Sequence, residues 1–78
     1  MSRARLPSRV RVHATLHGFA EKQRELELPE GARADDAPRA LDIRPELVLV
    51  FRDDRPLPAD EPLRDGDRIR ILRVVSGG

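Results

Sequence analysis

The sequence predicts a small α+β domain, in which a mixed sheet of four to five strands carries one short helix across one face. Its length of 78 residues supports only one hydrophobic core. Two segments near the start alternate apolar and polar residues, and two more apolar segments lie in the second half. An Ala-rich stretch between the two pairs is the one candidate helix.

The first two strands are predicted to form an antiparallel hairpin. Residues 9–16 alternate strictly, with Val10, Val12, Ala14 and Leu16 on the inward face. Residues 25–28 repeat this pattern after a turn that opens at His17-Gly18. Strands this close in sequence pair antiparallel, and Phe19 in the connection is expected to cap one end of the core.

A short helix is predicted between residues 31 and 43. Asp35 or Asp36 is expected to accept hydrogen bonds from the free amides of its first turn. Pro38 is tolerated only in that first turn, which limits the helix to about two turns. Leu41 and Ile43 are then expected to supply most of its buried contact.

The second half of the chain is predicted to hold three strands. The continuous apolar run 47–51 predicts a central strand covered at least partly on both faces. Residues 52–55 form a turn, and Pro56-Leu57-Pro58 is a short return segment at a sheet edge. The tight turn 65–67 needs Gly66 and leads into a last strand at 68–75. With the last strand parallel to the first, this order of elements is the β-grasp.

The chemistry is predicted to reside at the end of the chain, which reads Ser76-Gly77-Gly78. Glycine has no β-carbon, so the Gly77-Gly78 end can thread a narrow channel in another protein and present its terminal carboxylate there, with Ser76 as the first residue of the threaded tail. That carboxylate can be adenylated and then attacked by a sulfur donor or an amine, without any catalytic residue in this chain. The alternative interpretation is that Gly77-Gly78 is a chain end without a function. The β-grasp pattern that precedes it weighs against this alternative.

Three segments carry a resemblance to a known family: residues 9–12 with 25–32, residues 48–58, and residues 63–69 followed by 75–78. The chain resembles the MoaD/ThiS family of sulfur carriers and the archaeal small modifier proteins related to ubiquitin. The most specific part is the Leu-x-Asp-Gly-Asp-x-Ile strand that leads to Val-Ser-Gly-Gly. One departure is Arg73-Val74, where MoaD-type proteins usually carry two prolines. It places the chain nearer the modifiers and the carriers for transfer RNA thiolation.

The resemblance implies an ATP-dependent cycle. A ubiquitin-activating-type adenylyltransferase would convert Gly78 to an acyl-adenylate, and a sulfurtransferase or sulfur-acceptor enzyme would continue through a thiocarboxylate. The sulfur would go to molybdopterin, thiazole or a transfer RNA base. In the modifier branch, Gly78 would instead be joined to lysines of target proteins. No cofactor is expected to be permanently bound, because ATP is used by the partner enzyme, and the chain itself is expected not to be an enzyme.

A docking surface is predicted beside the tail. If Ile69 and Ile71 face the core, Arg70 points to solvent, and the residues that follow cannot all be buried. Small apolar patches rimmed by charge are typical of docking surfaces. The alternative is that these side chains cover the end of the sheet. The predicted docking residues are Arg70, Leu72, Arg73, Val74 and Val75.

Three domain regions follow from these patterns: a flexible basic arm at 1–8, the β-grasp domain at 9–75 and a flexible tail at 76–78. The chain has no apolar run of membrane-spanning length, so a cytoplasmic location is the expectation.

Composition weighs against other functions. The 15 basic and 14 acidic residues nearly cancel, and the chain has no Cys, Trp or Tyr. A rival function, RNA binding through a stripe of arginines on adjacent strands, therefore lacks both a positive field and stacking platforms.

His13 and His17 have no evident third partner, and no metal site is predicted. Lys22 is the single lysine, which would limit self-conjugation of a modifier. The arginines of the rival stripe are Arg9, Arg11, Arg68 and Arg70.

Overall fold

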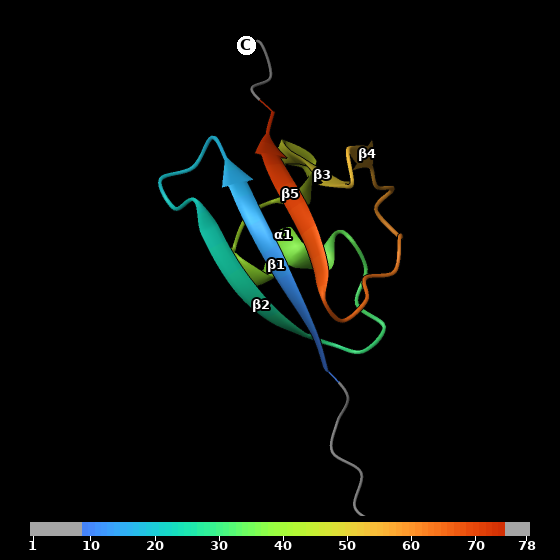
Figure 1. Cartoon of the computed structure of the whole chain (residues 1–78). Coiled ribbons are helices and arrows are strands. Elements are labelled where there is room, and N and C mark those ends of the chain that lie inside the picture. Colours follow the sequence, from blue (N-terminus) through green and yellow to red (C-terminus); the bar gives the residue numbers. More distant parts are fainter. Residues whose placement is uncertain (1–8, 75–78) are drawn as a thin grey trace, which may run out of the picture.

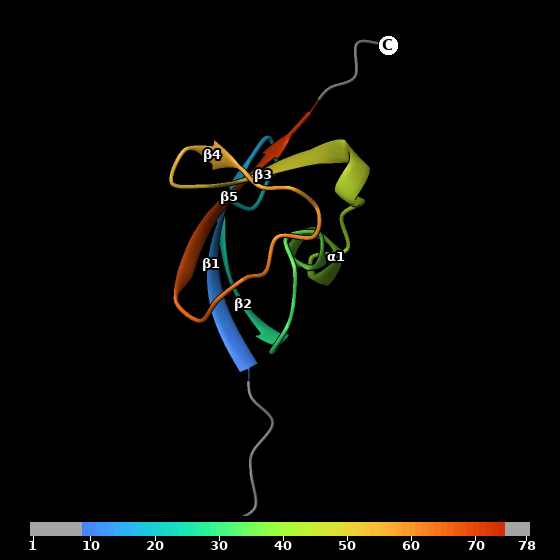
Figure 2. The ribbon, with the colours of Figure 1, turned by 90° about the vertical axis from the view of Figure 1, so that its right-hand side faces the viewer.

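The sheet has five strands in the order β2-β1-β5-β3-β4, and a computed structural model describes residues 9–74 (Figure 1). The helix α1 packs on one side of this sheet only (Figure 2). The predictions for the arm 1–8 and the tail 76–78 lie outside the described residues. The elements are β1 (Arg9–His17), β2 (Gln23–Pro29), α1 (Asp36–Ala40), the 3₁₀ turn η1 (Pro45–Leu47), β3 (Val48–Arg52), β4 (Arg55–Pro56) and β5 (Asp67–Arg73).

The predicted hairpin of β1 and β2 is confirmed. The two strands pair antiparallel from Arg9 opposite Pro29 to Thr15 opposite Gln23. The backbone N–H of Leu16 donates to the carbonyl of Lys22 at 2.8 Å and closes the connection. All four residues predicted to face inward from β1 are buried, and Phe19 packs against the core from its edge.

The last strand, β5, lies in the centre of the sheet, parallel to β1 and antiparallel to β3. Ile69 and Ile71 are almost completely buried beside Ala14 and Leu16, since paired residues on adjacent strands share one face. The turn before β5 is the predicted one, and Gly66 has a positive φ of 88°. Its N–H donates to the carbonyl of Arg11 at 2.7 Å, which fixes the parallel register.

The helix stays within the predicted limit of about two turns, but it packs differently than predicted. Its five residues place Pro38 in the first turn, as the proline rule requires. Leu41 and Ile43 are only half-buried, so the prediction that they supply most of the contact is wrong. The small side chains of Ala34 and Ala37, together with Pro38, fill the interface instead, because small residues allow the helix to lie close to the sheet.

The predicted helix cap is also wrong. Asp35 precedes the helix in an αR conformation and makes no side-chain hydrogen bond to its amides. The carboxylate of Asp36 accepts from the N–H of Arg33 at 2.8 Å, so it closes the turn before the helix. A capping residue normally has extended backbone, which directs its side chain back to the first turn, and Asp35 does not have it.

The apolar run 47–51 forms a strand inside the sheet as predicted, but the prediction that it is covered at least partly on both faces fails at Leu47 and Leu49. The strand β3 lies between β5 and the two-residue edge strand β4, and only Val48 and Val50 are buried. Leu47 and Leu49 remain 44% and 46% exposed. A single helix cannot cover both faces of a sheet, so alternate residues of this apolar run face solvent.

The turn at 52–55 and the short return segment are confirmed. Arg52 pairs with Arg55, and the two residues between them, Asp53 and Asp54, both have positive φ. Positive φ at both central positions is the backbone of a tight two-residue hairpin, and Asp tolerates it better than most side chains.

Arg52 joins the end of β3 to the loop before β5. Its guanidinium donates to Glu61 at 2.7 Å and to Asp67 at 3.0 Å. The hydrogen bond with Glu61 raises the pKa of Arg52 above its ordinary value, against the opposing effect of partial burial, and Asp67 acts in the same direction. The stability gained from a raised pKa is lost only as the pH rises through that pKa. The contribution of Arg52 therefore persists up to strongly alkaline pH.

We expect Arg52→Ala to lower the free energy of unfolding by about 1–2 kcal/mol, because two partly buried charge-assisted hydrogen bonds are lost. Urea unfolding followed by circular dichroism measures this change. The matched control is Arg9→Ala, whose ion pair with Glu27 is exposed and should contribute less than about 0.5 kcal/mol. Equal effects of the two substitutions would contradict the anchoring role of Arg52.

Candidate functional site

The candidate site is the end of the sheet where β5 leaves it. This end lies opposite the start of β1 and beside the connection between β1 and β2 (Figure 1). The predicted tail and docking residues Val75, Ser76, Gly77 and Gly78 lie outside the described residues. The residues that precede them, up to Val74, define the surface from which the tail departs.

An apolar surface lies on the face of the sheet away from the helix. Leu72 pairs with His17 of β1 and with Leu49 of β3, so these three side chains form one row. Phe51 lies in the next row, opposite Arg70, whose guanidinium carbon is 5.8 Å from the ring centroid. We call His17, Leu49, Phe51 and Leu72 the outer patch. Leu72 is 40% exposed.

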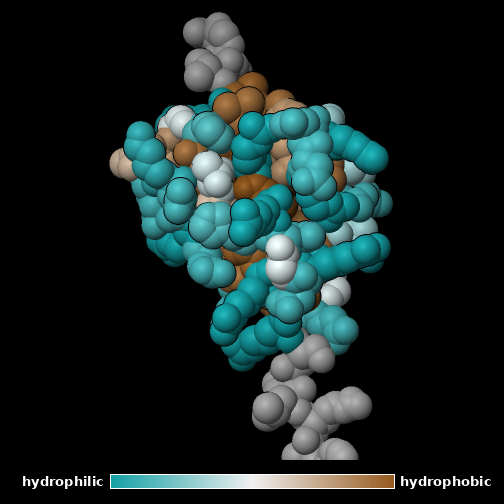
Figure 3. Space-filling model, in the orientation of Figure 1, coloured by the Kyte–Doolittle hydropathy of each residue, from teal (hydrophilic) through white to brown (hydrophobic). Residues whose placement is uncertain are grey.

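The outer patch is hollowed and lies near the departing chain. His17, Phe51, Arg70 and Leu72 line a shallow depression of about 190 Å³. Figure 3 shows this face of the molecule, where polar side chains predominate and apolar atoms gather at the end from which β5 leaves. Val74, also 40% exposed, extends the apolar surface toward the tail.

A second depression lies beside Arg73 and has a volume of about 340 Å³. Leu47, in this depression, accepts a hydrogen bond at its carbonyl from the N–H of Val74 at 2.8 Å. The Arg73 guanidinium carbon is 5.7 Å from the centroid of the Phe19 ring. The second depression is lined by Phe19, Asp42, Ile43, Arg44, Leu47 and Arg73.

Arg70, Leu72, Arg73 and Val74, which the sequence predicts as docking residues, are all exposed around this exit. Sequence reasoning missed Leu49 and Phe51, because the run 47–51 was interpreted as covered on both faces. The signal that finds them is the register of β3 on β5, which places Leu49 beside Leu72.

The arginine stripe of the RNA-binding hypothesis is largely paired with carboxylates. Arg9 and Arg11 both contact Glu27, and Arg70 contacts Asp54. These partners reduce the positive potential that a phosphate backbone requires. The stripe therefore gains no support from the geometry.

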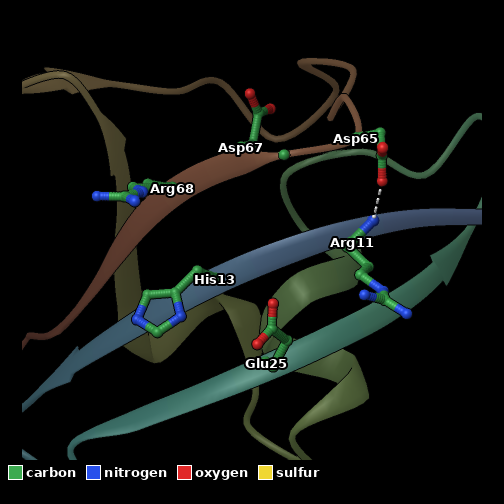
Figure 4. Close-up of a pocket in the computed structure, with 7 residues that line it drawn as sticks. Arg11, His13, Glu25, Asp65, Asp67 and Arg68 are labelled. Carbon is green, nitrogen blue, oxygen red and sulfur yellow. Dashed lines mark hydrogen bonds between the residues drawn. The ribbon is translucent and has the colours of Figure 1, made fainter.

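Further along the same face is a depression of about 430 Å³ with mixed charge (Figure 4). His13 lies opposite Glu25 on one side and Arg68 on the other. The carboxylate of Asp65 accepts a hydrogen bond from the N–H of Arg11 at 2.8 Å, so it stabilises the turn that precedes β5. Within residues 9–74, no three acidic, His or Cys side chains are grouped to hold a metal ion, and no helix is long and apolar enough to span a bilayer.

The mixed sheet with its final strand in the centre and one short helix on one face defines the class of ubiquitin-like β-grasp proteins. Solved structures share this fold. The ubiquitin of Caldiarchaeum subterraneum has a TM-score of 0.69 at 16% identity, over 91% of this chain and 100% of that one. A putative molybdopterin converting factor subunit 1 of Pyrococcus furiosus has a TM-score of 0.67 at 27% identity, over 85% and 99%.

Sequence comparison identifies the family. Residues 10–75 match the family model described as Small archaeal modifier protein 2, and the chain belongs to this family. Small archaeal modifier protein 2 of Haloferax volcanii is 31% identical over 67 residues, which are 86% of this chain and 100% of the relative. An uncharacterised protein of Archaeoglobus fulgidus is 38% identical over 61 residues, which are 78% and 88%. The predicted family resemblance and the β-grasp fold are thereby confirmed.

We expect Leu72→Ser to change the free energy of unfolding by less than about 1 kcal/mol, because its side chain already contacts water. Its buried neighbour provides the contrast: Ile71→Ala should cost about 2–5 kcal/mol. Thermal unfolding of both variants makes the comparison. A large loss for Leu72→Ser would mean that the outer patch is part of the core and not a docking surface.

Proposed function

We propose that this protein is a ubiquitin-like sulfur carrier whose Gly78 carboxylate is adenylated by a ubiquitin-activating-type enzyme and converted to a thiocarboxylate. The observation that supports this most is the exit of β5, which ends five residues before Gly78, between two exposed apolar depressions. The β-grasp domain then provides the surface that the partner enzyme binds. The catalytic groups and the ATP belong to that partner.

The chemistry needs only an accessible carboxylate. An oxygen of Gly78 attacks the α-phosphorus of ATP, and pyrophosphate leaves with formation of the acyl-adenylate. A hydrosulfide ion, supplied by a sulfur-delivering enzyme, then attacks the carbonyl carbon, displaces AMP and loses its proton, which leaves the thiocarboxylate. Gly77 and Gly78 allow close approach, because neither carries a β-carbon that would collide with a narrow channel. The sulfur would be passed to a transfer RNA base, molybdopterin or thiazole.

Docking of the partner is assigned to the outer patch together with Arg70 and Val74. An interface gains most from apolar and aromatic side chains near its centre, with charged groups at the rim. Leu49, Phe51 and Leu72 supply the apolar centre, and Arg70 lies at its rim. The predicted docking residue Val75 would extend this surface along the tail.

A second function shares the same first step. The family to which the chain belongs is named for modifiers, which favours attack of a target-protein lysine on the activated Gly78. The ε-amine would form an isopeptide bond and displace AMP. Its own single lysine, Lys22, leaves few sites for attack by another copy.

Deletion of Gly78 tests the carrier proposal. Incubation of the intact protein with the activating enzyme of its own organism, ATP and a sulfide donor should replace one oxygen by sulfur, detectable by intact-protein mass spectrometry. The deleted chain should show no mass change, while Lys22→Arg, which alters no part of the tail, should behave as the parent. Sulfur incorporation into the deleted chain would refute the assignment of Gly78.

Conjugation is tested in cells of the source organism. If the protein also modifies others, an epitope-tagged copy should appear in a ladder of larger species on a denaturing gel, and the Gly78 deletion should abolish that ladder. Thiocarboxylate formation without any ladder would restrict the protein to the carrier role. A ladder that persists without Gly78 would contradict conjugation through Gly78.

A further inference from the structure

The last part of β5 is held on its β3 side by backbone hydrogen bonds and on its β1 side by the side chain of Arg73. Pairing with β1 ends at Leu72 opposite His17, because the chain turns away at Gly18. On the β3 side the contact continues for two more residues. Arg73 pairs with Val48, and the N–H of Val74 donates to Leu47.

The Arg73 side chain covers the β1 side where the backbone pairing ends. Gly18 has a φ of 92°, and a β-carbon built on it would lie 2.8 Å from the β-carbon of Arg73. The backbone at Gly18 therefore lies directly against this side chain. The guanidinium continues over the Phe19 ring at 5.7 Å, and Phe19 itself packs on the core.

We infer that Gly18, Phe19 and Arg73 form a clamp that keeps Val74 bonded to Leu47 and so fixes the direction in which the tail is presented. This inference rests on the proposed function, and it makes Arg73 a positioning residue, whereas the sequence predicts a docking residue. Arginine suits this place because its planar cation stacks on an aromatic face while its stem lies along the glycine.

The length of the tail makes its direction matter. Four residues follow Val74, and they span at most about 13 Å when extended. When the tail is held extended in the channel of the partner enzyme, a rotation of about 10° at Val74 would move the Gly78 carboxylate by about 2 Å. A misplacement of about 1 Å between reacting groups can cost on the order of 100-fold in rate. If Val74 were not held in place, adenylation would thus be slow even when the β-grasp domain is correctly docked.

The test is the rate of ATP–pyrophosphate exchange by the activating enzyme of the same organism, with the concentration of this chain varied. Arg73→Ala and Phe19→Leu should each lower kcat about tenfold or more and change KM less than about twofold. Arg73→Lys should recover most of kcat, because a cation remains over the ring. The control, Arg68→Ala, removes an exposed arginine of the same strand outside the clamp and should match the parent.

A rise in KM at unchanged kcat for Arg73→Ala would overturn the clamp and return Arg73 to the docking surface. Hydrogen exchange of the Val74 amide in the free protein is the second arm. It should quicken about two- to fivefold in Arg73→Ala, the expected effect of one exposed cation–π contact, and not in Arg68→Ala. Unchanged exchange would also overturn the clamp. If the parent itself supports no pyrophosphate exchange, the proposed function fails, while the amide measurement still decides the clamp.

Discussion

The parallel pairing of β5 with β1 is the constraint on which the rest of the structure depends. Parallel strands cannot be joined by a tight turn, so a long connection must lie between β1 and β5, and it contains β2, α1, β3 and β4. The register is set where Asp65 and Gly66 bind both backbone groups of Arg11. From this one register follow the burial of Ile69 and Ile71 and the exposure of Leu72 at the end of the sheet.

The same pairing places the candidate functional site. Because β5 is central, its carboxyl end lies between β1 and β3 and not at an edge, so both neighbours can hold it. Leu47 holds the backbone of Val74, and the connection at Gly18 and Phe19 holds the side chain of Arg73. Under the proposed function, a fixed Val74 followed by a short tail that ends in glycine suits a carrier whose catalytic groups belong to another protein.

Local patterns predict much of this fold, and the errors lie where contacts between distant segments decide the outcome. The alternation of residues 9–16 fixes which side chains face the core, so the hairpin could be predicted. The run 47–51 has no alternation, and its exposed members follow only from its register on β5. The helix was predicted in the right place with the wrong contacts, because the close packing of Ala34 and Ala37 depends on the distance between layers. Of the site, Leu72 and Val74 follow from the strand pattern, whereas Leu49, Phe51 and the clamp on Arg73 require the tertiary structure.

The most direct measurement follows the oxygen atoms of the Gly78 carboxylate. The protein is prepared with ¹⁸O in that carboxylate and incubated with the activating enzyme, ATP and a sulfide donor, and the AMP released is analysed by mass spectrometry. Adenylation of Gly78 followed by displacement predicts that AMP carries one ¹⁸O from the protein. Release of unlabelled AMP, alongside a chemically changed protein, would contradict activation at Gly78.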